Sequence, residues 1–200
     1  MNGLDVLLTG FGAFEQVSDN PSGFLARELD GQALSGGRVV GALLPVSFER
    51  GPQELERLVE RVRPIAILAM GVHPGDGFRI ERGAGVILAP DRPDVDGVTA
   101  QDLPGRTGSR ISTGLDIVRL GQVLDAAADA EVRISDDAGG YVCESVYRRA
   151  LEIGEATRTP CLFLHVPPFE RLSRDQQRSA VLALLGELSD QVGGPREGAE

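Results

Sequence analysis

Cysteine and histidine are scarce in this 200-residue chain, which has only two of each. Two cysteines, Cys143 and Cys161, are too few for a disulfide framework, and without secretion we expect both to be free thiols. Two histidines, His73 and His165, leave few candidates for chemistry that needs an imidazole. The chain has neither an HExxH pattern nor a paired-cysteine spacing, so we expect no metal site.

Positive charge and long apolar runs are also lacking. Lys and Arg total 20 against 30 Asp and Glu, a formal net charge of −10. This balance argues against nucleic-acid and anionic-membrane partners, because phosphate binding depends on Lys and Arg. No apolar run approaches the ~18 residues of a membrane helix, and residues 1–5 carry no basic flank typical of a signal peptide. We therefore expect a cytoplasmic protein.

Apolar strands alternate with amphipathic helices along the chain. This order predicts a single-domain three-layer α/β/α sandwich around a mostly parallel twisted sheet. We expect one domain over residues 1–192 and a flexible tail at 193–200. The expected strands are 5–9, 38–46, 65–70, 78–88, 131–135 and 161–165, and the expected helices are 20–29, 47–63, 116–128, 142–155 and 175–192. Residues 89–114, rich in Pro, Gly and Asp, are expected to be irregular.

The stretch Asp136 to Ser145 (DDAGGYVCES) joins a predicted strand to a predicted helix. Gly139 and Gly140 can adopt backbone angles that are closed to other residues, so they favour a sharp turn. Cys143 then falls in or near the first helical turn, where free N–H groups and the positive dipole end favour a thiolate. A free cysteine is also often only a small buried residue, so a catalytic interpretation needs a partner group.

His165 is the candidate partner, because it ends the predicted strand 161–165. One crossover helix joins this strand to 131–135, and strands connected in this way are usually neighbours. Ligands in such sheets bind beyond the carboxyl ends of strands, so we expect Cys143 and His165 to meet there. A thiol beside an imidazole can form an ion pair that attacks a carbonyl. His73, in the loop after strand 65–70, is expected to be an exposed loop residue.

Glu81 lies in the extended segment 78–88, in which Phe78 and Ile80 alternate with Arg79 and Glu81. A glutamate on a strand is usually a surface residue. Near a buried histidine, it could instead orient the imidazole ring.

The turn after the first strand, Gly10 to Phe14 (GFGAF), partly matches a dinucleotide-binding fingerprint. A third glycine is missing, because Glu15 occupies its place, so we expect no nucleotide cofactor. Two other interpretations stay open. The segment is either a tight turn with two core aromatics, or Phe11 and Phe14 line a pocket at the end of the strand.

Three motifs resemble those of the pyroglutamyl peptidase I (pyrrolidone-carboxylate peptidase) family. They are FRIERGA at 78–84, GGYVC at 139–143 and FLHVP at 163–167, and TGFGAF at 9–14 followed by NPS at 20–22 is similar to the family's opening. The resemblance spans about residues 4–188. It implies an α/β/α sandwich that uses no cofactor and forms a homo-oligomer, commonly a tetramer. Its implied activity is removal of N-terminal pyroglutamate (5-oxoproline) from peptides.

The resemblance also implies roles for single residues. Cys143 matches the nucleophile, His165 the base and acid, and Glu81 the orienting carboxylate. Phe11 and Phe14 match an aromatic clamp for the pyrrolidone ring, and a flat neutral lactam suits such an apolar slot. Further substrate contacts are expected at four positions: Val72, Arg92, Tyr141 and Val142.

The chain departs from the family pattern in the segment near Pro93. The family often has an arginine where this chain has Asp91. We expect the adjacent Arg92 to turn inward and Asp91 outward when substrate binds, since a cation would stabilise the developing oxyanion.

Two other functions are compatible with these motifs. One is a thiol amidohydrolase that acts on another small cyclic or N-blocked substrate. The other is a catalytically silent binding protein that has kept the fold.

Overall fold

The computed structural model describes residues 4–14, 19–86, 91–104 and 108–193. The strands are β1 (Val6–Phe11), β2 (Ala33–Leu34), β3 (Gly37–Leu44), β4 (Ala66–Val72), β5 (Phe78–Glu81), β6 (Gly83–Ala84), β7 (Ile111–Ser112), β8 (Val132–Ser135) and β9 (Cys161–Val166). The helices are α1 (Pro21–Glu28), α2 (Arg50–Val62), α3 (Ile117–Ala128), α4 (Val142–Thr157) and α5 (Arg174–Gly193), with one 3₁₀ turn, η1 (Ala100–Asp102).

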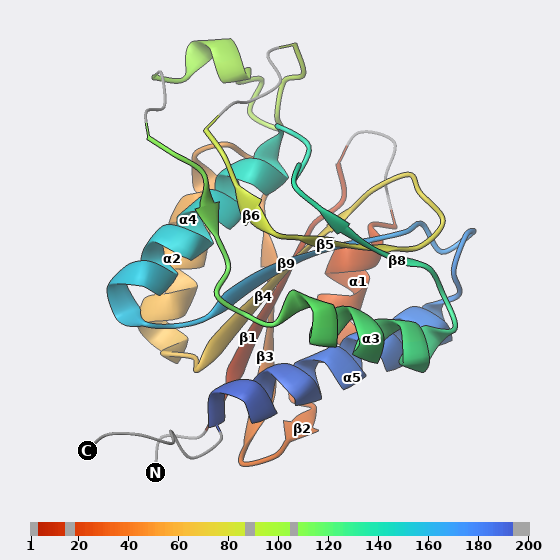
Figure 1. Ribbon diagram of the computed structural model, residues 1–200. Helices are drawn as coiled ribbons and strands as arrows, with labels where there is room; N and C mark the ends of the chain where they lie inside the picture. Colours follow the sequence, from red (N-terminus) through yellow and green to blue (C-terminus); the bar gives the residue numbers. More distant parts are fainter. Residues whose placement is uncertain (1–3, 15–18, 87–90, 105–107, 194–200) are drawn as a thin grey trace.

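A seven-stranded sheet forms the middle layer, in the order β2-β3-β1-β4-β9-β5-β8. Helices α2 and α4 cover one face, and α1, α3 and α5 cover the other (Figure 1). Four of the strand pairs are parallel, and the pairs β2–β3 and β5–β9 are antiparallel. The predicted three-layer sandwich with a mostly parallel sheet is therefore confirmed.

The central strands are apolar because both of their faces are covered. Every residue of β1 and β9 is buried, and so is every residue of β4 except Val72. Along β9, Phe163 belongs to the core beneath α2 and α4, whereas Leu162 and Leu164 belong to the core beneath α1, α3 and α5. His165 follows Phe163 at a spacing of two and so faces α4 as well.

The helix ends follow local capping chemistry. The Asn20 side chain accepts a hydrogen bond from the Ser22 N–H at 3.2 Å, with Pro21 as the first residue of α1. Three helices end on a residue in the left-handed conformation, which closes the last turn. These residues are Arg63 (φ 52°), Asp129 (φ 50°) and Arg158 (φ 59°).

The helix that Ser47 was predicted to cap starts at Arg50. The Ser47 hydroxyl still accepts a hydrogen bond from the Arg50 N–H at 3.1 Å, so it closes the turn that leads into α2. The segment 89–114 is not wholly irregular, because its described part includes η1 and β7. Residues 194–200, most of the predicted tail, lie outside the described residues.

The single extended segment predicted for 78–88 is wrong. Strand β5 ends at Glu81, and Gly83–Ala84 pairs with β7 in a separate two-stranded sheet. A Cβ on Gly83 would lie 2.2 Å from the Ile111 carbonyl oxygen, so this close pairing requires glycine. Leu88 lies outside the described residues.

The expectation that β8 and β9 are neighbours is also wrong, because β5 lies between them. The loop from β4 to β5, residues 73–77, is too short for a crossover helix. Strand β5 therefore runs antiparallel to β9, and the β8–α4–β9 connection crosses over it.

None of the helices within the described residues combines the length and the apolar character needed to cross a membrane.

Candidate active site

Cys143 is the second residue of α4, as predicted. Two residues with positive φ, Gly139 (92°) and Gly140 (62°), turn the chain from β8 into Tyr141, the N-cap of the helix. The Asp137 side chain accepts a hydrogen bond from the Gly139 N–H at 2.8 Å and stabilises the turn. The first N–H groups of α4 are thereby left without helical partners beside the thiol.

Cys143 and His165 face each other across Gly71 of β4. A Cβ built on Gly71 would lie 2.8 Å from Cys143 Sγ and 3.2 Å from His165 Cδ2. The thiol and the Cδ2–Nε2 edge of the imidazole therefore occupy the space that a side chain on β4 would fill. The two groups meet because α4 lies over β4 and β9, and not because their strands are neighbours.

Glu81 completes the arrangement from β5. Its Oε1 accepts a hydrogen bond from His165 Nδ1 at 2.7 Å, and both side chains are buried. This bond places the ring proton on Nδ1 and leaves the Nε2 lone pair on the side of the thiol. The alternative of a surface Glu81 is wrong, because its side chain is fully buried.

The electrostatics of this pair fix its resting charge. Burial opposes ionisation of Glu81, but the hydrogen bond of His165, the nearby Ser135 hydroxyl and the charge of Arg79 act against burial, and the pKa of Glu81 lies below its usual value. Burial also lowers the pKa of His165, and the bond to Glu81 only partly compensates. At neutral pH the site thus holds an ionised Glu81 and a neutral His165, the form that can accept a proton.

The surroundings of Cys143 oppose the thiolate that its place at the start of α4 favours. Burial raises the pKa of this thiol to about 12, and the charge of Glu81 acts in the same direction. Arg79 and a backbone hydrogen bond oppose the increase without cancelling it. The resting pair is therefore thiol and imidazole, so the thiol must lose its proton to His165 during attack.

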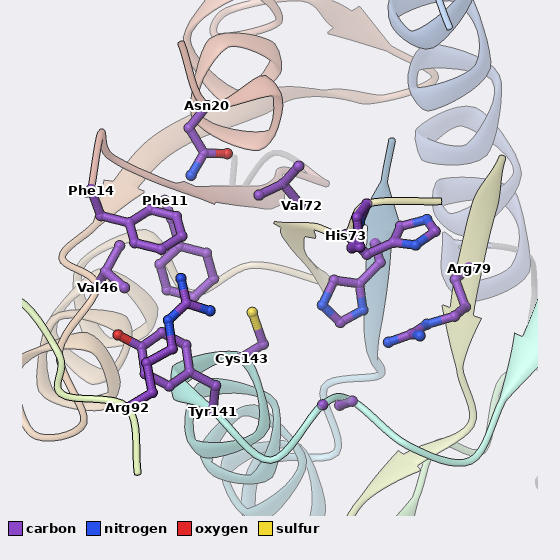
Figure 2. Close-up of a pocket in the computed structure, with 14 residues that line it drawn as sticks. Phe11, Phe14, Asn20, Val46, Val72, His73, Arg79, Arg92, Tyr141 and Cys143 are labelled. Atoms are coloured by element: carbon purple, nitrogen blue, oxygen red, sulfur yellow. The ribbon is translucent and has the colours of Figure 1, made fainter. Parts of the chain in front are cut away.

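A cavity of about 280 Å³ opens beside Cys143 (Figure 2). On one side of the sulfur, aromatic and aliphatic side chains line it, namely Phe11, Phe14, Val46 and Tyr141. On the other side lie His73 and Arg79. Phe11 and Phe14 thus line a pocket at the end of β1, which was one of the two interpretations left open.

Gly10, the first glycine before Phe14, is required by packing. A Cβ on Gly10 would lie 2.0 Å from the Ser22 carbonyl oxygen, so glycine lets α1 approach β1 closely. The Asn20 side chain donates a hydrogen bond to the Gly12 carbonyl at 3.1 Å, which holds the turn that carries both aromatics. Close helix–strand packing therefore accounts for the first glycine of the partial nucleotide fingerprint, whereas a Cβ on Gly12 would meet nothing within 4 Å.

Two of the other predicted contacts, Val72 and Arg92, also line the cavity. The Arg92 guanidinium lies over the rings of Tyr141 and Phe14, 4.6 and 5.3 Å from their centroids. Asp91 is exposed and accepts a hydrogen bond from Gln101 at 3.4 Å. Arg92 therefore faces the cavity, and its expected movement on substrate binding stays a prediction.

Val142 could contact a substrate only through its backbone, so its predicted contact stays a prediction. Its side chain is fully buried in the core beneath α2 and α4 and does not line the cavity. It is the first residue of α4, so its inward face is occupied by packing against the sheet. Only its backbone atoms remain available for a substrate.

Several residues around the site were not predicted, among them Val46, Gly71, His73 and Arg79. No sequence pattern distinguishes Gly71 from other glycines in apolar strands. His73 was expected to be exposed, yet it is half-buried, with Nε2 donating to the Gly77 carbonyl at 2.8 Å and Nδ1 accepting from the Gly75 N–H at 3.2 Å. Arg79 was seen only as part of an alternating strand, although that alternation puts it on the face of Glu81.

Glu144 follows the candidate nucleophile and is buried. It accepts a hydrogen bond from the Gly85 N–H and so ties the start of α4 to the segment after β6. Its negative charge is a further factor that raises the pKa of the Cys143 thiol.

A thiol, an imidazole and a carboxylate thus meet at one edge of an α/β/α sandwich, an arrangement typical of thiol hydrolases. The family model described as pyroglutamyl peptidase matches residues 4–184. The chain therefore belongs to the pyroglutamyl peptidase family, as the motifs predicted.

Individual relatives agree with this assignment. The chain is 38% identical over 170 residues to the pyrrolidone-carboxylate peptidase of Deinococcus radiodurans, covering 81% of this chain and 77% of the relative. The solved pyrrolidone carboxyl peptidase of Pyrococcus furiosus superposes with a TM-score of 0.85 at 25% identity, covering 94% and 99% of the two chains. The enzyme from Thermococcus litoralis shares the fold with a TM-score of 0.85 at 24% identity, covering 98% of each chain.

Proposed function

We propose that this chain is a cysteine peptidase that removes N-terminal pyroglutamate from peptides. Cys143 serves as the nucleophile, His165 as the base and acid, and Glu81 as the orienting carboxylate. One observation carries the proposal: the Glu81–His165 pair and the Cys143 thiol converge around Gly71, beside a cavity lined by aromatic side chains.

The proposed reaction begins with proton transfer from the neutral thiol. His165 Nε2 removes this proton as Sγ attacks the carbonyl carbon that joins pyroglutamate to the next residue. Negative charge then forms on the carbonyl oxygen, where the free N–H groups at the start of α4 can stabilise it. His165 returns the proton to the leaving amine nitrogen, and the C–N bond breaks. A thioester remains on Cys143, and water activated by His165 hydrolyses it to free pyroglutamate and the thiol.

The cavity supports selection of a lactam over an ordinary N-terminus. Phe11, Phe14 and Val46 offer an apolar surface to a flat, neutral ring. A peptide with a free N-terminus would place an ammonium group against this surface and beside the Arg92 guanidinium. The cost of removing that charge from water, together with the like charge of Arg92, disfavours such substrates.

The decisive test uses two chromogenic amides with the same leaving group, one pyroglutamyl and one prolyl. We expect release from the pyroglutamyl amide and none from the prolyl amide. Cys143→Ala should reduce turnover to background. Cys161→Ala is the matched control, because this second thiol is buried, bonds to the Ala150 carbonyl at 3.0 Å and does not line the cavity.

The outcomes separate the alternatives. Equal loss in both cysteine variants would contradict the assignment of Cys143 as nucleophile. A folded wild-type protein that cleaves neither amide would instead favour another cyclic substrate or a binding function. A cytoplasmic location and a homo-oligomer, a tetramer by resemblance, stay predictions, and light scattering on the purified protein tests the second.

A further inference from the structure

Arg79 makes two hydrogen bonds that join separate parts of the site. Its Nε donates to Glu81 Oε1 at 2.7 Å, the same oxygen that accepts the bond from His165 Nδ1. Its Nη2 donates to the Asp137 carbonyl at 3.1 Å. One planar guanidinium therefore spans the proposed orienting carboxylate on β5 and the turn that precedes the proposed nucleophile.

The sheet register makes this bridge possible. In the antiparallel β5–β9 pair, Arg79 lies opposite His165 and Glu81 lies opposite Phe163. All four side chains therefore point to the face that α4 covers. A residue on a strand can hold its neighbours more rigidly than a loop residue can, because the strand backbone is fixed by its ladder.

The second contact point, Asp137, belongs to the turn that leads from β8 into α4. Gly139 and Gly140 follow it with positive φ, and the Ser135 hydroxyl also donates to the Asp137 carbonyl at 3.1 Å. Two donors thus hold this one carbonyl. The guanidinium also donates to Glu81 Oε1 and so links this carbonyl to the Glu81–His165 pair.

We infer that Arg79 is a positioning residue that locks the Glu81–His165 pair and the Cys143 turn in one geometry. The inference rests on the proposed function and assigns this arginine a part in the same reaction. Without the bridge, the imidazole and the N–H groups at the start of α4 would no longer be held in fixed positions relative to each other. Turnover would then fall more than substrate affinity, because the cavity walls at Phe11 and Phe14 stay in place.

Arg133 provides a matched control. It lies beside Arg79 in the register of the parallel β5–β8 pair, but its side chain is 72% exposed and pairs with Glu131 at 2.7 Å. Arg79→Ala and Arg133→Ala thus remove the same side chain from adjacent strands. Only the first removes a contact with the site.

The test compares the kinetics of both variants on a pyroglutamyl amide with hydrogen–deuterium exchange of residues 136–143. We expect Arg79→Ala to lower kcat by about 10- to 100-fold, since misplacement by about 1 Å costs about 10²-fold. KM should change by less than about 3-fold, millimolar guanidinium should restore part of the rate, and exchange in the turn should accelerate. Arg133→Ala should match the wild type in all four measurements.

The result that overturns the inference is an Arg79→Ala protein that matches Arg133→Ala in both kcat and exchange. If Arg79→Ala fails to fold, Arg79→Lys decides, because one ammonium cannot reach both partners in the geometry of the guanidinium fork. A wild-type kcat in Arg79→Lys would then overturn the inference. A wild-type protein that does not cleave the amide contradicts the proposed function instead. The exchange comparison still tests the bridge in that case, with unchanged exchange overturning it.

Discussion

Gly71 offers the sharpest test of the site geometry, because it touches the reacting groups without taking part in chemistry. Replacing it by alanine adds one methyl group between three side chains. The new Cβ would lie 2.8 Å from Cys143 Sγ, 3.1 Å from Phe163 Cζ and 3.2 Å from His165 Cδ2. Ordinary contacts with a Cβ begin at 3.4 Å, so the sulfur must move by at least about 0.6 Å.

The size of the effect follows from that displacement. A shift of about 0.6 Å approaches the roughly 1 Å that costs about 10²-fold in rate, so we expect kcat/KM to fall about 10- to 100-fold. Overpacking of this kind costs about 1–3 kcal/mol, and the lower entropy of the unfolded alanine chain offsets about 0.4–1 kcal/mol of it. For a chain of this size the Tm should therefore fall by no more than about 10 °C.

The assay is release from a pyroglutamyl amide, together with the rate at which iodoacetamide alkylates Cys143 and a thermal melt. Gly186→Ala on α5 is the control, because a Cβ there would meet nothing within 4 Å. That variant should keep the wild-type rate and gain about 0.5–1 kcal/mol of stability. A folded Gly71→Ala protein with wild-type kcat/KM and alkylation would refute the placement of Cys143 against His165.

Four further predictions follow from the site. Glu81→Gln should fold but lower kcat by up to ~10⁴-fold if Glu81 acts like a triad aspartate, and a wild-type rate would reduce the site to a Cys–His pair. Phe14→Ala should weaken substrate binding by about 1–3 kcal/mol, measured as KM in a folded variant; no change would leave Phe14 only a packing role. Arg92→Ala should lower kcat by roughly 10- to 10³-fold, and a silent variant would exclude an oxyanion contact. Since the pKa of His165 is lowered from 6.5 and that of Cys143 is raised to about 12, kcat/KM should fall with acid only below pH 6.5 and stay level above pH 9; a midpoint near 9 would indicate unassisted thiol ionisation.

The sequence predicts the layers and the site more reliably than the strand order. Alternating apolar strands and amphipathic helices are local patterns, so they predict the sandwich correctly. The place of β5 depends on a loop of five residues, 73–77, that cannot cross over the sheet, and neither periodicity nor composition shows this. Cys143 and His165 were predicted to meet because their strands are neighbours, which they are not. They meet because α4 lies over the face of β9 that carries His165.

The residues of the site differ in how well their positions and roles can be predicted from the sequence. Cys143 could be placed from two glycines and a helical pattern, since both are encoded within ten residues. Gly71 and Arg79 could not, because their roles depend on which side chains another strand brings opposite them. His73 was expected to be exposed since it follows a strand in a Pro-Gly loop. Two hydrogen bonds to that same loop fold its ring back toward the cavity instead.

Glu81 explains how a thiol with a raised pKa can still react. Its carboxylate is fully buried, and Oε2 has no hydrogen-bond partner among the described residues, since the nearby Ser135 hydroxyl bonds the Asp137 carbonyl. In the resting protein the Arg79 guanidinium pairs with this carboxylate at 2.7 Å, whereas its other partner, His165, is neutral. When His165 takes the thiol proton, the neutral imidazole becomes a cation 2.7 Å from this carboxylate, in surroundings that screen charge poorly. The attraction between Glu81 and a charged His165 therefore appears only after the proton has moved, and it adds to the attraction of Arg79. The buried carboxylate thus destabilises an isolated thiolate but stabilises the thiolate–imidazolium pair that attack requires. Catalysis depends on this kind of interaction, which is stronger in the transition state than in the ground state.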